Sequence, residues 1–423
     1  MIDSVKIIHD EKRIKEYRFW ADYFRFIGVH VWDCTLKNDD YSEDFSIVVV
    51  IEKDIDKAKL EEVCTKYPNA IRLDSVDGRN FNISDTNKGE EKRKEWEFSW
   101  IDYLEDGLSS IEKKLSDQGM KQSVSDFESM KVIGKIYVKY CISYFRNVYS
   151  YFKEEEIFVQ QAQDKFVDAY VALRKNYSNC EKTAYTLYTL ANLTRYINET
   201  CVLLNQKLLL STERCLEYLD RAMNLQPTFY NAQLLKGIVC GIDKAFAQES
   251  GVYYKRALDN MGKKKYTSYP HYLYGRYWER TMKDIIEAKK YYQISYELNE
   301  LEYRAIYKLA IIAKREGRYE ESLRWFRKIC SILSDKEKDN YLQPKEYEYL
   351  SKAYFEISKL YGDVFWNLDG YEDTIKKLNE LYGKIINGEP KNDAYKELFG
   401  EQEQILREAT YLRIKTMQMQ CKQ

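Results

Sequence analysis

Residues 302–334, EYRAIYKLAIIAKREGRYEESLRWFRKICSILS, read as two amphipathic helices joined by a tight turn. Small and apolar residues recur at helical spacing along the first half of this stretch: Ile306, Leu309, Ala310 and Ala313. Gly317 and Tyr319 mark the turn. The same spacing resumes after the turn: Ser322, Phe326 and Ile329. A single helical hairpin cannot bury such a face, so this stretch predicts neighbouring hairpins of the same kind.

The pattern of small and large residues recurs through the second half of the chain. Its copies begin at intervals of 35, 38 and 34 residues: Cys215, Ser250, Ala288 and Ser322. Small residues stand in the preceding helices at Gly237, Gly275 and Ala310, where they allow paired helices to approach closely. This period resembles the tetratricopeptide repeat (TPR) family, whose unit is a 34-residue helical pair. The best-preserved unit is 302–335, followed by 268–301.

Residues 1–76 predict a small α/β domain instead. Four short apolar runs predict strands: 5–8, 29–32, 46–51 and 70–73. One helix is predicted over 11–27 and ended by Gly28, and a second over 56–67 is capped by Asp56. This order predicts a parallel sheet with helices packed on it, in which ligands bind beyond the carboxyl ends of the strands. The predicted fold class is therefore a small parallel-sheet α/β domain followed by a predominantly α-helical, TPR-like solenoid.

Two families resemble this N-terminal region. The Toll/interleukin-receptor (TIR) domain is similar in the runs KIIHD, GVHVWD and SIVVVI and in the helix that follows them. Enzymatic members hydrolyse NAD with a glutamate on that helix, which the resemblance places at Glu61 or Glu62. The chain also resembles the response-regulator receiver, whose phospho-acceptor would be Asp54. These resemblances imply either an NAD hydrolase of bacterial antiviral defence, regulated by the repeats and with NAD as its substrate, or a phosphorylation switch.

The chain divides by sequence into four segments: an α/β domain (1–76), a linker and helical connector (77–180), TPR-like repeats (181–390) and a capping helix with a tail (391–423). The connector begins with a polar loop, and its helices are predicted over three ranges: 91–115, 126–151 and 154–176. Tyrosines recur every three or four residues along the second of them, which indicates packing between helices.

The composition limits the classes of partner. Lys and Arg number 67 against 68 Asp and Glu, and a net charge of -1 favours neither nucleic acid nor an anionic membrane. No apolar run reaches the roughly 18 residues of a membrane span. Nine cysteines without a Cys-x-x-Cys pair favour reduced thiols in the cytoplasm over disulfides or zinc ligation. We predict no cofactor and no metal site.

A repeat array joined to a domain without an intact catalytic motif favours a cytosolic adaptor or sensor over an enzyme. The TPR resemblance implies that a protein or peptide partner lies along the surface of the first helices. On this chain that surface would carry six residues: Tyr272, Arg276, Arg304, Tyr307, Lys308 and Ile311. Their mixture suits an extended ligand, because cations pair with carboxylates and aromatic rings cover apolar side chains. The sequence also allows an oligomer, because a neighbouring chain could add a fifth strand to the small sheet.

Overall fold

The computed structural model describes nine stretches of the chain: residues 2–35, 47–52, 54–73, 90–119, 124–145, 155–177, 183–261, 267–338 and 344–387. The chain forms two compact units. Unit 1 comprises residues 1–147, 161–201 and 208–239, and unit 2 comprises 148–160, 202–207 and 240–423. The predicted capping helix in 391–423 lies outside the described residues. The division into four segments stays a prediction.

Unit 1 contains a parallel four-stranded sheet in the order β2-β1-β3-β4. The strands are β1 (Ser4–His9), β2 (His30–Thr35), β3 (Ile47–Ile51) and β4 (Ile71–Leu73). Val49 of β3 is paired with Ile7 on one side and with Ile71 on the other, which places β3 inside the sheet. Its continuous apolar run suits an inner strand covered on both faces, and all four predicted strands are confirmed.

Helices pack on both faces of this sheet. The short 3-10 helix η1 (Glu11–Arg13) leads into α1 (Ile14–Phe26), and α2 (Lys57–Lys66) follows β3. Side chains of β1 alternate between the two layers: Ile8 packs with Val63 of α2, whereas His9 stacks on Tyr17 of α1 with ring centroids 4.4 Å apart. Asp56 is the predicted cap of α2, and its carboxylate accepts the amide of Ala58 at 2.9 Å.

The remaining helices of unit 1 run along the chain as follows: α3 (Glu90–Asp117), α4 (Val124–Ile136), the π-helical turn η3 (Tyr137–Cys141), α5 (Glu155–Tyr177, whose first residues belong to unit 2), α6 (Ala184–Leu203), α7 (Thr212–Leu225) and α8 (Tyr230–Ile242, whose end also belongs to unit 2). Predicted helices 91–115 and 154–176 correspond closely to α3 and α5.

The prediction of one regular helix over 126–151 is wrong, because α4 changes to a π-helical turn at Tyr137. The amide of Ile142 donates to the carbonyl of Tyr137 at 2.9 Å, which inserts one residue into the helical repeat. The insertion lets Tyr137 and Phe145, eight positions apart, both reach the ring of Phe26 in α1. Tyr140 of the predicted stripe is only half-buried as a result.

The sheet packs directly on the helices of unit 1. The Tyr185 hydroxyl of α6 donates to the carbonyl of Ile2 at 2.6 Å, and the Asn231 amide of α8 donates to the carbonyl of Gly28 at 2.6 Å. Gly28 has φ +89° and ends α1, as the sequence predicts. A side chain at Gly28 would lie 2.7 Å from Phe229 and 2.8 Å from Tyr188.

Replacing Gly28 by alanine is expected to destabilise the protein by about 2–3 kcal/mol. The left-handed backbone alone costs about 1 kcal/mol, and forcing a methyl group against two packed rings adds at least as much. Gly119 is the matched control, because it has φ +70° and open space around it. We therefore expect Gly119→Ala to cost only the backbone contribution in urea unfolding. Equal losses for the two variants would contradict the packing at Gly28.

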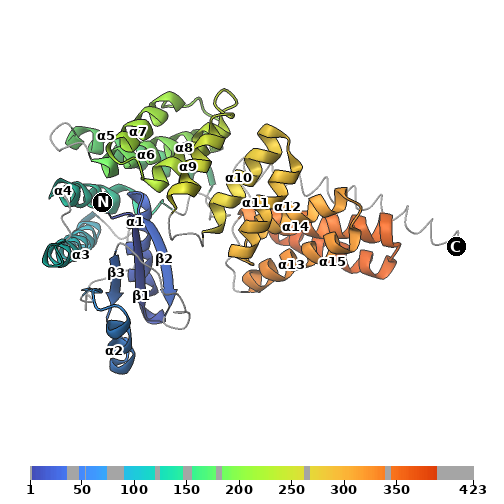
Figure 1. Ribbon diagram of the computed structural model, residues 1–423, viewed down its shortest axis with the longest axis horizontal. Coiled ribbons are helices and arrows are strands. Elements are labelled where there is room, and N and C mark those ends of the chain that lie inside the picture. The colour runs from blue at the N-terminus through green and yellow to red at the C-terminus, as the bar shows by residue number, and fades with distance from the viewer. Residues whose placement is uncertain are drawn as a thin grey trace. The chain divides into compact units, whose positions relative to one another are not determined.

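Unit 2 is built from helical pairs (Figure 1). Its elements are α9 (Ser250–Asn260), α10 (Ser268–Tyr277), the π-helical turn η4 (Trp278–Met282), α11 (Ile285–Leu298), α12 (Tyr303–Arg315), α13 (Tyr319–Lys338), α14 (Pro344–Lys359), the π-helical turn η5 (Leu360–Phe365) and α15 (Leu368–Asn387). Each first helix packs on the second helix of its own pair, and that second helix packs on the first helix of the next pair, which is a TPR-like solenoid.

The predicted apolar face of 302–334 forms the centre of the unit 2 core. Ile306 and Ala310 of α12 pack with Phe326 and Ile329 of α13, and all four side chains are fully buried. The same cluster continues into the next pair through Leu350 of α14. The need for neighbouring hairpins that the sequence predicts is therefore confirmed.

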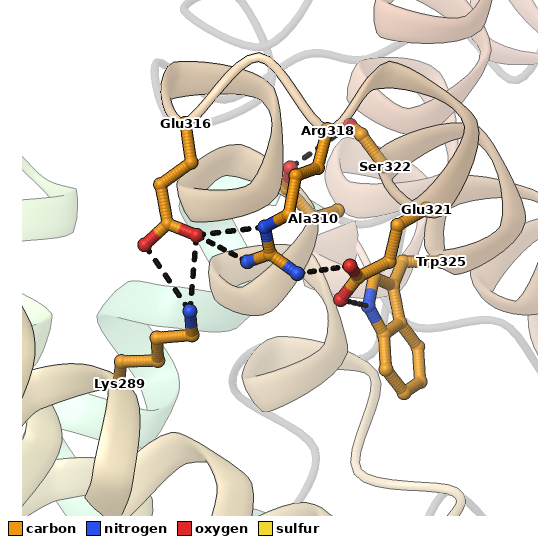
Figure 2. A network of polar contacts seen from close by, with 7 residues as sticks. All are labelled: Lys289, Ala310, Glu316, Arg318, Glu321, Ser322 and Trp325. Carbon is orange, nitrogen blue, oxygen red and sulfur yellow. Dashed lines mark hydrogen bonds and ion pairs between the residues drawn. The ribbon is translucent and has the colours of Figure 1, made fainter.

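The turn between α12 and α13 is fixed by glycine and by backbone hydrogen bonds. Gly317 has φ +76°, and the amide of Arg318 donates to the carbonyl of Ala313 at 2.9 Å. The amide of Gly317 donates to Lys314 at 3.1 Å, so two carbonyls at the end of α12 are satisfied. Beyond the turn, the Ser322 hydroxyl donates to the carbonyl of Ala310 at 2.9 Å and joins the two helices (Figure 2).

Figure 2 also shows a chain of charged side chains over this turn. Lys289 of the preceding pair donates to Glu316 at 3.0 Å, and Glu316 also pairs with Arg318. Arg318 pairs in turn with Glu321, which accepts the Trp325 indole N–H at 3.3 Å. Such exposed ion pairs contribute little to stability one by one. We therefore infer that this network mainly orients successive helical pairs.

Candidate functional site

The side chains of α10 and its continuation η4, of α12 and of α14 form one face of unit 2, which we call the first-helix face. Close packing of each pair holds this face in place. At Gly275 of α10, a side chain would lie 2.8 Å from the ring of Tyr292 in α11. Small residues at Gly275 and Ala310 thus bring the second helices close behind the first helices, as the sequence predicts.

A cluster of tyrosines occupies the centre of the first-helix face. The ring of Tyr349 in α14 lies 5.2 Å from Tyr303 and 5.3 Å from Tyr307 of α12. Its hydroxyl is 3.4 Å from the hydroxyl of Tyr272 in α10. Since α12 lies between α10 and α14, this last contact indicates that the stack curves toward the first-helix face. Burial raises the pKa of Tyr272, so its phenol stays neutral and able to donate a hydrogen bond.

Arg304 is held by a carboxylate of its own helix start. Its Nε and Nη2 donate to the two oxygens of Glu302 at 2.6 and 3.1 Å, which is a bidentate pair. The guanidinium also lies 4.7 Å from the ring centre of Tyr269 in α10. Burial opposes the charge of Arg304, but Glu302 outweighs it and raises the pKa. The charge of Arg304 is therefore already matched inside the protein.

Lys308 is paired across two helices. Its ammonium lies 2.8 Å from Glu279 in η4, and Glu279 also accepts the Tyr292 hydroxyl at 2.6 Å. Burial lowers the pKa of Lys308 in spite of this pair, and the cations Arg280 and Arg276 lower it further. Glu279 has a lowered pKa, because its hydrogen bonds from Lys308 and Tyr292 together outweigh the opposing effect of burial. The pair is ionised and links α10 to α12.

Arg276 differs from the other two cations. It makes no ion pair with any residue that the structure describes, and its Nε is shielded from solvent without an acceptor. The guanidinium carbon lies 5.9 Å from the ring centre of Tyr272. Ile311 is half-buried and packs against the unit 2 core, so its side chain serves the fold at least in part.

The structure thus brings Tyr272, Arg304 and Tyr307 into one cluster, with Arg276 and Lys308 beside it. Sequence reasoning missed the residues that pair with them: Tyr269, Glu279, Glu302, Tyr303 and Tyr349. No repeat position signals these partners, because Tyr269, Glu279 and Tyr349 come from neighbouring elements, whereas Glu302 and Tyr303 stand at the very start of α12. That the six predicted residues bind a partner stays a prediction.

The strand ends of unit 1 form a second candidate site. The chain places β2 on one side of β1 and then β3 and β4 on the other side, so the topological switch point lies between β1 and β3. Open parallel sheets bind ligands at such a point. Asp54 lies in the turn after β3, has φ +68°, and its carboxylate accepts the Arg13 Nε at 2.6 Å. Arg13 also donates to Glu16 at 2.9 Å. Burial opposes the charge of Arg13, but these two carboxylates raise its pKa.

Glu61 and Glu62 are both exposed on α2. Within the described ranges, neither carboxylate forms an ion pair, and the only contact recorded for Glu61 is its main-chain carbonyl accepting the Thr65 hydroxyl at 2.7 Å. Asp54 is therefore paired with a cation, whereas neither glutamate pairs with one among the described residues. The part of the chain that the structure describes holds no group of three or more His, Cys, Asp or Glu side chains that could bind a metal ion.

Comparison with known proteins gives structural likenesses. No protein-family model matches the chain, and no curated protein matches it in sequence. It is similar to YrrB, described as a TPR protein with an unusual peptide-binding site (21% identity, 52% of this chain, 93% of that chain, TM-score 0.33). It is also similar to a TPR protein from Parabacteroides merdae (17%, 62%, 93%, TM-score 0.35) and to yeast Tom70 (14%, 84%, 74%, TM-score 0.40). With TM-scores below 0.5 these likenesses carry no functional conclusion, and the TPR-like architecture rests on the helical pairs themselves.

Among the helices that the structure describes, none combines the length and the apolar composition that crossing a lipid bilayer requires.

Proposed function

We propose that the protein is an adaptor that holds an extended segment of a partner protein on its first-helix face. The observation that carries this proposal is the surface itself. Aromatic rings and cations from the first helices of three successive pairs lie together on one curved face of the stack. Extended peptides gain affinity from such surfaces because rings cover apolar side chains and cations pair with carboxylates. The adaptor would act in the cytoplasm.

Two further observations support this proposal. The sheet of unit 1 is packed on α6 and α8, so it is a built-in part of that unit rather than a tethered module, and it offers a second surface for a sensor role. Among the residues that the structure describes, five cysteines are buried and form no disulfide: Cys141, Cys201, Cys215, Cys240 and Cys330. Buried reduced thiols suit a reducing compartment such as the cytoplasm.

The test is a pull-down from lysate of the native cell with the full-length protein as bait. We expect a partner that is retained by the native protein and by Arg324→Glu, which changes an exposed residue of the second helix α13. The double variant Arg276→Glu/Arg280→Glu reverses charge on the first-helix face and is expected to lose that partner. A partner set that is identical for all three baits would count against the adaptor.

A receiver-like switch is a second candidate function. The strand order and the position of Asp54 at the β1/β3 boundary favour it, because this is where doubly wound sheets bind ligands. The Arg13 pair would have to open before Asp54 could accept a phosphoryl group. Acetyl phosphate or beryllofluoride that leaves the protein unchanged, with Asp54→Asn as control, would remove this candidate.

The third candidate is a TIR-like NAD hydrolase that uses Glu61 or Glu62. The exposure of both carboxylates on α2 gives it the least support, since NAD cleavage needs a site that excludes water around the substrate. Incubation of concentrated protein with NAD tests it, alone and with candidate partners or as an oligomer. Turnover that disappears in Glu62→Gln would place this candidate above the adaptor.

A further inference from the structure

Where η4 meets α12, the cations outnumber the carboxylates that pair with them. Arg276 of α10 and Arg280 of η4 stand about one helical turn apart. Lys308 of α12 pairs with Glu279 of the same η4 turn, and the charges of both arginines lower the pKa of Lys308, in addition to the larger effect of burial. Over the described ranges, Glu279 is the one carboxylate that pairs with any of these three cations. A single carboxylate therefore faces three cations at the junction of η4 and α12.

Arg276 is the member of this group that is prepared for an external anion. Lys308 has its counter-ion at 2.8 Å, and Arg304 in the tyrosine cluster has a bidentate one. Arg276 has a shielded Nε that meets no acceptor in the described part of the chain, and the Tyr272 ring lies beside it. A guanidinium that is partly desolvated and still unpaired gains strongly when a carboxylate reaches its terminal nitrogens.

We infer that Arg276, flanked by the exposed Arg280, anchors an acidic side chain of the partner segment on the first-helix face. This inference rests on the proposed adaptor function and adds the chemistry of the partner: an acidic peptide. Nucleic acid fits less well, because it needs a stripe of cations that follows successive phosphates. Here the cations form one small group, with Arg276 beside the ring of Tyr272, and the chain as a whole has a net charge of -1.

The experiment selects short random peptides displayed on phage against the full-length protein and measures the affinity of the enriched sequences. We expect enrichment of Asp and Glu, and a loss of affinity of at least about tenfold in Arg276→Gln, as for other truncated charge pairs. Arg276→Lys keeps the charge but not the planar fork, so its loss should be intermediate. Arg324→Gln on α13 removes the same charge elsewhere and should change nothing.

Circular dichroism establishes that each variant is folded, and if Arg276→Gln is not, Arg276→Lys is compared with the native protein instead. Enriched peptides that lack acidic residues and bind Arg276→Gln as well as the native protein would overturn the inference while the adaptor function stands. An oligonucleotide that binds more tightly than every acidic peptide would overturn it as well. If no peptide is enriched and the pull-down retains no partner, both the inference and the adaptor function fail.

Discussion

Replacing Asp22 by asparagine is expected to stabilise the protein by about 3–4 kcal/mol at pH 8 and hardly at all at pH 4. The Asp22 side chain of α1 is only 18% exposed, and the Nη1 atom of Arg25 lies 3.5 Å from its carboxylate. Burial raises the pKa of Asp22 to about 7, against the opposing charges of Arg25 and Arg18. Each pKa unit corresponds to about 1.4 kcal/mol between the two protonation states.

The sign follows from proton uptake. Between about pH 4 and pH 7 the folded protein holds the Asp22 proton and the unfolded chain has released it, so stability falls as the pH rises through this window. Above pH 7 both states are ionised and the penalty is constant. Asparagine has the same shape and no charge, so it removes the penalty wherever the penalty exists.

Urea unfolding followed by tryptophan fluorescence measures this effect, because Trp20 and Trp100 are buried in unit 1. Asp106→Asn is the matched control, since that carboxylate is exposed on α3; it should change stability by less than about 0.5 kcal/mol at either pH. An equal effect of Asp22→Asn at pH 4 and pH 8 would show that burial of the charge is not its cause.

Truncating Ile329 to alanine is expected to destabilise unit 2 by about 3–4 kcal/mol. Ile329 is fully buried where α13 meets α12 and α14, and it lies in the same cluster as Ile306, Phe326 and Leu350. The lost methyl and methylene groups leave a cavity that three packed helices cannot close without moving. Because the repeat units stabilise one another, we expect the loss to reach the neighbouring pairs.

The matched control is Ile286→Ala, the same chemical change at a residue of α11 that is 82% exposed. It should change stability by less than about 0.5 kcal/mol. Hydrogen exchange of the α12 and α13 amides compares the two variants directly. Similar losses of protection in both would contradict the position of the core.

The repeat core could be predicted from sequence because its signals are local. Gly317 permits the left-handed turn, and the spacing of Ile306, Ala310 and Phe326 identifies the buried face without knowledge of the neighbours. The other turns could not be predicted. Lys283 and Trp366 adopt φ +59° and +51° after the π-helical turns η4 and η5. Unlike a glycine, a lysine or a tryptophan in the sequence does not indicate a left-handed backbone.

The candidate site was predicted only in outline for a related reason. The TPR resemblance implied that Arg304 and Lys308 lie on the surface of the first helices, but it could not show that Glu302 and Glu279 already pair with them. Tyr349, the centre of the tyrosine cluster, comes from a repeat too divergent to align by its spacing. Pairing between side chains of different helices depends on how the helices are aligned in three dimensions. That alignment cannot be derived from the spacing of residues in a single sequence.

The central claim is that the first-helix face binds a partner protein, and site-specific photo-crosslinking in the native cell tests it most directly. The photo-reactive residue p-benzoylphenylalanine replaces Arg280 on the first-helix face in one protein and Arg324 on α13 in another; both positions are exposed. We predict a discrete crosslinked partner from position 280 and none from position 324. The same partner from both positions, or a partner from position 324 alone, would contradict the account.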